Sequence, residues 1–402
     1  MLTFAPRKTY KGKKMTGQKQ TRAAISAFFI IMGMVFASWA SRIPDVQQMY
    51  HLSNGQLGTL LFAIPFGHAF SIIPVGMMVS RFGSRRMTTV SMLMYAISLF
   101  AIPFAINYIT LFLMLMALGF TANAMDVSIN TQAVVLETQY GRSILSAFHG
   151  MWSLGGLFGG IIGAMFANIG MGLMPHFTTI FVISLAVIAI CRRFLIQEST
   201  VQHAKENTEP FNLKHIDSIL WILGIIGFAG MFCEGATYDW SAVYFSKVVK
   251  PDATFIRAGY IAGVAAMTIG RLSADRFITR YGHKKVLECC SLFIIIGFAL
   301  VVTIPDLIPA SFGYALTGLG ISAVCPICYS QAGRHPSVKT STALTFVSSL
   351  GFIGFLISPP IIGWVSEVIG LRLTMIIGSL SGLTILIFSR TIKKSKQKQA
   401  TL

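Results

Sequence analysis

Long apolar segments alternate with short polar ones along the whole chain of 402 residues. Each apolar segment has about 20 residues or more, which is enough for an α-helix to cross the roughly 30 Å hydrocarbon core of a bilayer. We therefore expect an all-α polytopic membrane protein. The pattern predicts twelve spans, over residues 23–41, 55–79, 87–106, 109–136, 144–169, 174–196, 216–240, 255–277, 286–304, 307–331, 341–367 and 371–391.

The second half of the chain repeats the first. The loop "SRFGSRR" (residues 80–86) follows the second predicted span, and "TRYGHKK" (residues 279–285) follows the eighth. Parallel repeats of this kind are a known plan of transporters. The predicted parts are a basic N-terminus (1–22), a six-helix bundle (23–196), a polar linker (197–215), a second six-helix bundle (216–391) and a basic tail (392–402).

The charges are distributed as in a membrane protein. Hydrophobic residues make up 54% of the chain and charged residues 11%, with a net charge of +18 that could suggest nucleic-acid binding. Given the predicted spans, however, 27 of the 32 lysines and arginines fall on one side of the membrane and five on the other. This is the positive-inside pattern, so we expect cytoplasmic termini and no nucleic-acid partner.

The sequence offers little support for catalysis. Six cysteines lie in or beside apolar segments, which is not a disulfide framework. Cys325 and Cys328 form a CPIC sequence, which is either a redox motif or a pair of small packing residues around a proline kink. The chain has no P-loop motif and no cluster of metal ligands. We expect no enzyme activity, cofactor or metal, with a redox enzyme that uses the CPIC as a competing hypothesis.

Twelve spans in a six-plus-six repeat, with a basic loop after spans two and eight, resemble the major facilitator superfamily over essentially the whole chain. The resemblance implies the major facilitator fold. The loop after span two has Ser80 where the family usually has Asp, and the loop after span eight has Thr279 there. The charge-linked gate of the family therefore lacks its acid in both copies.

These two basic loops are candidate gating elements. Gly83 and Gly282 should allow a tight turn between spans, and the neighbouring basic residues should hold the turn at the cytoplasmic face. The loops either only anchor the protein by the positive-inside rule or also take part in gating. The candidate gating residues are Arg81, Gly83, Arg85, Arg280, Gly282 and Lys284.

Shorter segments resemble particular branches of the superfamily. The segment "AMDVSIN" (residues 124–130) is similar to the acid-containing fourth span of fucose-type sugar–proton symporters. The segments "ASWASRIP" (37–44), "FHGMWSLGG" (148–156) and "EGATYDWS" (234–241) resemble a poorly characterised bacterial branch of inner-membrane permeases. This resemblance implies the cytoplasmic (inner) membrane of a bacterium.

Asp126 is the most informative residue, because a charge near the bilayer centre costs about 2.5–3.5 kcal/mol and usually faces a cavity or a partner. On a helix, Asn123, Asp126 and Asn130 share one face. Asp126 is either a structural carboxylate satisfied by neighbouring helices or a proton or solute site in a cavity. Its counterpart in the second half is Ile327, so the repeated fold does not require an acid there.

The second half has its own acidic candidates. Glu234 lies in the seventh predicted span, with Tyr238 one helical turn further on. It is either a second proton or substrate site or a paired structural carboxylate. Asp239 follows close to the expected outer end of the span, where it would be solvated, so we rank it below Glu234.

Four further residues complete the candidate set. Arg42 ends the first span, either snorkelling to the interface or pairing with a carboxylate or the solute. His149 opens the fifth span and could carry a proton near neutral pH or simply pack there. Trp39 and Trp240, equivalent in the two halves, either anchor the interface or cap the cavity.

The prediction for function is a secondary active transporter that moves a small polar solute, such as a sugar or related metabolite, by alternating access with proton coupling. Its partners would be the solute, protons and the lipid bilayer, and we expect a monomer. The alternative is a proton-driven exporter of amphiphilic compounds. The segment "GGLFGGIIG" (residues 155–163) lets helices approach closely but lacks the proline typical of drug/proton antiporters, which argues against the exporter.

Overall fold

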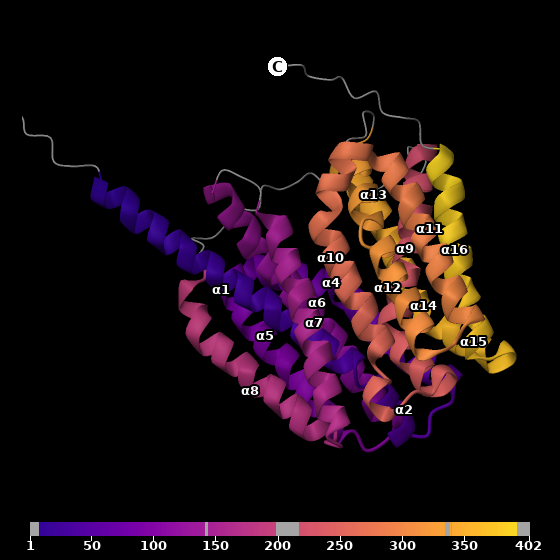
Figure 1. The fold of residues 1–402 in the computed structure, drawn as a ribbon. Helices are drawn as coiled ribbons and strands as arrows, with labels where there is room; N and C mark the ends of the chain where they lie inside the picture. The colour runs from indigo at the N-terminus through magenta and orange to yellow at the C-terminus, as the bar shows by residue number, and fades with distance from the viewer. Residues whose placement is uncertain (1–7, 141–143, 198–216, 334–337, 339, 392–402) are drawn as a thin grey trace, which may run out of the picture. The chain divides into compact units, whose positions relative to one another are not determined.

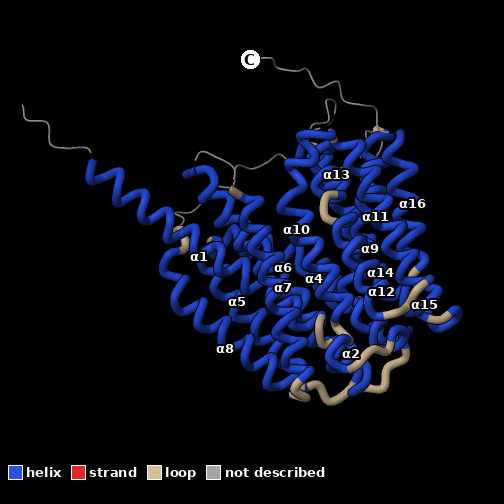
Figure 2. The backbone as a smooth tube through the Cα atoms, viewed as in Figure 1, coloured by secondary structure: helices blue, strands red, loops and turns tan. Residues whose placement is uncertain are grey.

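The structure is a computed structural model, and it describes residues 8–140, 144–197, 217–333, 338 and 340–391. These residues form helices and loops, with no strand among them (Figure 2). Twelve helical segments within this part of the chain are long and apolar enough to cross a membrane. The predicted all-α class and number of spans are therefore confirmed.

The chain groups into two compact units. The first unit comprises Met1–Arg42 and Ala63–Glu206, and the second comprises Ile43–Phe62 and Asn207–Leu402. The segment Ile43–Phe62, which the sequence analysis places with the first bundle, thus packs with the second unit.

Six long helices build the first unit, with α1 packed along α7, α4 and α5 packed on α6, and α8 on α5 (Figure 1). The helices are α1 (Lys8–Ala40), α4 (Ala63–Phe82), α5 (Ser84–Ala101), α6 (Tyr108–Tyr140), α7 (Leu145–Asn168) and α8 (Leu173–Cys191), with short 3-10 helices η1 (Ile102–Phe104) and η2 (Arg192–Phe194).

Glycines set the closest helix contacts of this unit. At Gly155 in α7, a Cβ atom would lie 1.9 Å from the carbonyl oxygen of Ile30 in α1. At Gly119 in α6, it would lie 1.9 Å from the carbonyl oxygen of Ile64 in α4. Neither position can carry a side chain unless the helices separate. The expectation that glycines of the fifth span permit close approach is confirmed at Gly155.

In the second unit, α9 packs on α14, α12 packs on both α10 and α11, and α16 packs on α11. Helix α3 also packs on α14. The elements are α2 (Ile43–Met49), α3 (Asn54–Leu61), α9 (Ser218–Tyr244), η4 (Phe245–Val249), η5 (Ala253–Phe255), α10 (Ala258–Tyr281), α11 (His283–Thr303), α12 (Leu307–Ile321), α13 (Val324–Ala332), α14 (Thr340–Ile369), α15 (Leu371–Thr374) and α16 (Ile376–Thr391).

Prolines explain the helix breaks in two of the predicted spans, whereas the last span is interrupted at Met375, between α15 and α16, without a proline. Pro65 follows the interruption at Phe62 between α3 and α4, and Pro326 follows the interruption at Ser322 and Ala323 between α12 and α13. A proline lacks the N–H that would bond four residues back, and its ring clashes with that carbonyl. The breaks therefore fall about one turn before each proline. By contrast, α6 runs unbroken through the position equivalent to α13.

Candidate functional site

Asp126 lies in α6, half-buried, with a neutral partner. Asn130 Nδ2 donates to Asp126 Oδ1 at 2.9 Å, one helical turn away. Asn123, 4% exposed, donates instead to Ser71 Oγ in α4 at 2.7 Å. No ion pair to Asp126 is present in the part of the chain that the structure describes. The carboxylate is thus hydrogen-bonded but carries no compensating charge.

An apolar cluster and a buried tyrosine lie next to the Asp126 position. Val127, its neighbour in α6, packs against a buried cluster that includes Val75 and Met87. Tyr95 of α5, 2% exposed, lies close enough to Asp126 for the two to interact electrostatically. An acid in such surroundings is suited to binding and releasing a proton.

Glu234 of α9 forms an ion pair that the sequence analysis missed. Arg271 Nη2 of α10 donates to Glu234 Oε1 at 2.6 Å, and the two side chains are 26% and 10% exposed, respectively. Tyr238 lies close enough to Arg271 for the two to interact electrostatically, and its hydroxyl donates to Met267 Sδ at 3.8 Å. The signal was available, since Arg271 is a charged residue inside the eighth predicted span. Glu234 is therefore a paired carboxylate, and Arg271 joins the candidate set.

The CPIC sequence borders this pair. Cys325 is the second residue of α13, just after the helix break, and lies near enough to interact with both Glu234 and Arg271. Tyr329, one turn on, lies close enough to Cys325 for the two to interact electrostatically. Both cysteines are free. Together Glu234, Arg271, Tyr238 and Cys325 form a polar cluster within the second unit.

The expected solvation of Asp239 is wrong. Helix α9 continues to Tyr244 and η4 extends to Val249, so Asp239 lies inside the span and is only 8% exposed. Asp239 lies close enough to Tyr260 of α10 for the two to interact electrostatically, and the buried Tyr260 hydroxyl has no hydrogen-bond partner among the described residues. No ion pair to Asp239 is recorded over the same residues.

The remaining candidates are mostly buried. Arg42 is 2% exposed and donates to the Met171 carbonyl at 2.8 Å, so it does not snorkel. Trp39 and Trp240 are both 0% exposed, which argues against interfacial anchors, and within the described chain neither indole N–H has a partner. His149 of α7 is exposed and lies edge-on to the ring of Phe29.

The two basic loops have the same local geometry. Gly83 and Gly282 each have φ of +79° at the start of the following helix, a conformation that favours glycine. Before the glycine, Arg81 lies over the Phe82 ring and Arg280 over the Tyr281 ring. After it, Arg85 donates to Gln197 and Lys284 donates to the Arg390 carbonyl. The tight turns are confirmed, while the gating role stays a prediction.

Two proteins of known sequence resemble this chain over most of its length. Membrane protein MosC of Rhizobium meliloti is 32% identical over 357 residues, which cover 88% of this chain and 86% of that protein. An uncharacterised major-facilitator-type transporter of Yersinia pestis is 28% identical over 379 residues, which cover 94% of this chain and 96% of that protein.

Solved structures share the fold at low sequence identity. A mutant of the nucleoside transporter NupG has a TM-score of 0.77 at 14% identity, over 93% of this chain and 100% of that one. A D-xylose-proton symporter has a TM-score of 0.77 at 13% identity, over 92% and 97%. The transporter FucP in its outward conformation has a TM-score of 0.62 at 18% identity, over 93% and 98%.

The comparisons agree with the resemblance seen in the sequence. A profile of the Major Facilitator Superfamily matches residues 23–338 and, in an overlapping second match, residues 267–401. Twelve spans, a repeated basic loop and whole-length relatives point the same way. The chain belongs to the major facilitator superfamily of membrane transporters.

Proposed function

We propose that this transporter moves a small polar solute by alternating access and couples the movement to protons. The observation that carries the proposal is a pair of intramembrane carboxylates, Asp126 and Asp239, with no ion pair to either in the described chain. An uncompensated carboxylate inside a span is costly, and its charge disappears when it takes up a proton. Asp126 is the leading proton site.

The ion pair of Glu234 and Arg271 is the proposed solute anchor. A guanidinium offers several N–H donors and a carboxylate offers acceptors, so together they suit the hydroxyl groups of a polar solute. Arg271 keeps 26% of its side chain exposed, which leaves part of the group free for a ligand. Because the charges of the pair balance each other, Asp239 replaces Glu234 as the second proposed proton site.

Solved relatives of similar fold guide the choice of solute. They are named as transporters of nucleosides, D-xylose and fucose, all of which carry several hydroxyl groups. The proposed class is therefore a hydroxylated metabolite such as a sugar, polyol or nucleoside. We further propose the cytoplasmic membrane of a bacterium, cytoplasmic termini and a monomer, on the basis of the positive-inside charge pattern and the full-length relative in Yersinia pestis.

The experiment has two stages. A thermal-shift screen of sugars, polyols, nucleosides and amphiphilic drugs at pH 5.5 and 7.5 identifies the solute by pH-dependent stabilisation of the purified protein. Proteoliposomes containing a pH-sensitive dye then report proton movement driven by a gradient of that solute. Asp126→Asn should abolish this movement, while Asp275→Asn, which removes an exposed carboxylate in α10, should leave it unchanged.

The outcomes separate the alternatives. Undiminished coupling in folded Asp126→Asn protein would remove Asp126 from the proton path, and the same test applies to Asp239→Asn. Stabilisation by amphiphilic compounds alone, with export driven by protons, would establish the exporter instead. Loss of transport on replacing both Cys325 and Cys328 with Ser would revive a redox role.

A further inference from the structure

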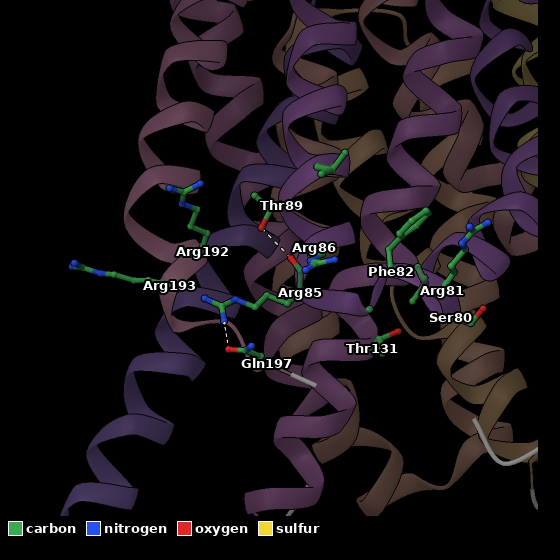
Figure 3. Close-up of a pocket in the computed structure, with 13 residues that line it drawn as sticks. Ser80, Arg81, Phe82, Arg85, Arg86, Thr89, Thr131, Arg192, Arg193 and Gln197 are labelled. Carbon is green, nitrogen blue, oxygen red and sulfur yellow. Dashed lines mark hydrogen bonds between the residues drawn. The ribbon is translucent and has the colours of Figure 1, made fainter. Parts of the chain in front are cut away.

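A pocket of about 780 Å³ lies in the first unit, where α4 ends and α5 begins (Figure 3). It is lined by the last turn of α4, the turn at Gly83, the first two turns of α5, Thr131 of α6, Arg192 and Arg193 of η2, and Gln197. None of the proposed proton or solute residues lines it. The pocket therefore calls for a separate explanation.

The lining of the pocket is strongly basic. Among the described residues that line the pocket, five are arginines and none is acidic. Arg85 and Arg86 lie at the centre of the view, with Arg192 and Arg193 to one side and Arg81 to the other (Figure 3).

No counter-charge for these arginines lies among the residues that the structure describes. Within the residues that the structure describes, no ion pair involves any of the five. Arg85 Nη1 donates to the neutral Gln197 at 3.0 Å. Ser80, also in the lining, is neutral too. Gathering like charges without a counter-charge is unfavourable, so an anion would stabilise this pocket.

The backbone at the start of α5 adds further hydrogen-bond donors to the pocket region. Helix α5 begins at Ser84 after Gly83, with no side-chain cap. The first bond within the helix runs from the Met87 N–H to the Gly83 carbonyl. The backbone N–H groups of Ser84, Arg85 and Arg86 therefore lie at the positive end of the helix dipole, beside the arginine side chains. Such a helix start suits a phosphate group.

An apolar stripe leads away from the basic residues. Phe82 and Val90 line the pocket and are 45% and 52% exposed. The stripe continues along α5 with Met94 and Ile97, which are 44% and 37% exposed and follow Val90 at one-turn spacing. A ligand that fits both parts has an anionic head and an apolar tail.

We propose that this pocket binds the phosphate headgroup of an anionic phospholipid, with the acyl chains along the exposed stripe of α5. By the positive-inside pattern the pocket lies at the cytoplasmic face, where anionic lipids attract basic residues. The shared chemistry is a phosphate anion, which a soluble phosphate compound could also supply. The apolar stripe favours the lipid.

The test measures binding to the purified full chain by microscale thermophoresis. The probes are dioctanoyl phosphatidylglycerol, dioctanoyl phosphatidylcholine, glycerol 3-phosphate and sodium phosphate. The repeat provides a matched control, because Lys284→Gln/Lys285→Gln removes two charges from the equivalent loop of the second half. Relative to wild type, Arg85→Gln/Arg86→Gln should bind phosphatidylglycerol about 25-fold more weakly, at about fivefold per basic residue near a membrane surface.

The control should bind within about twofold of wild type, and rising salt should weaken wild-type binding. Equal weakening in the control, or equal binding of phosphatidylcholine, would overturn the proposal. Competition by glycerol 3-phosphate or sodium phosphate at the lipid's own concentrations would show that the ligand is a soluble anion. If the double variant does not fold, Arg192→Gln should weaken binding about fivefold, and no change there would also overturn the proposal.

Discussion

Removing one member of the Glu234–Arg271 pair should cost more stability than removing both. Arg271 Nη2 lies 2.6 Å from Glu234 Oε1. Glu234→Gln leaves the guanidinium without its counter-charge, and Arg271→Gln does the same to the carboxylate. The double variant has no charge left to desolvate, and its two amides can hydrogen-bond each other.

The exposure of the two side chains sets the magnitude. Removing one partner of a fully buried pair costs about 3–5 kcal/mol, whereas an exposed pair is worth about 0.2–1 kcal/mol. The side chains are 26% and 10% exposed, so each single variant should lose about 2 kcal/mol, between those ranges. The double variant should lose about 1 kcal/mol, which leaves a coupling energy of about 3 kcal/mol.

Differential scanning fluorimetry of the purified protein measures these changes. A loss of about 1 kcal/mol lowers Tm by about 2–4 °C in a domain of this size, so each single variant should melt about 4–8 °C lower and the double about 2–4 °C lower. Arg276→Gln, which removes an exposed arginine of the same helix, should change little. A double variant whose loss equals the sum of the two single losses would show that the pair is not coupled.

Two further changes test the helix contacts and the loops by the same measurement. Gly155→Ala should lose about 1–3 kcal/mol through overpacking, because its Cβ would lie 1.9 Å from the Ile30 carbonyl oxygen; Gly156→Ala, with nothing within 4 Å, is the matched control, and equal effects would contradict the packing. Gly83→Ala, at φ of +79°, should lose about 1–2 kcal/mol from backbone strain, and an unchanged Tm would refute it.

The features that sequence predicts well here are those fixed by local chemistry. The spans follow from apolar segments long enough to cross a bilayer, and all twelve are present in the described residues. The turns at Gly83 and Gly282 follow from the one residue type that adopts positive φ without strain, and both have φ of +79°. Neither feature depends on which helix packs against which.

The features that sequence misses depend on packing or on small helix distortions. Glu234 and Arg271 are 37 residues apart in the chain, and only the approach of α10 to α9 brings them together. Asp239 is misplaced because hydropathy ends the seventh span near residue 240, whereas the helix continues to Tyr244. The proline-induced breaks are missed because hydropathy does not register backbone hydrogen bonds, although Pro65 and Pro326 were visible in the sequence.

The internal repeat favours a functional role for Asp126 over a packing role. In the second unit the equivalent position is Ile327, which is 0% exposed and lies in the first turn of α13, after the break between α12 and α13. In the first unit α6 is continuous, and Asp126 is half-buried with Asn130 as its partner. Since a buried isoleucine serves the packing at this position in one copy, packing does not explain the acid in the other. The cost of holding a carboxylate there is better explained by the proton coupling proposed above.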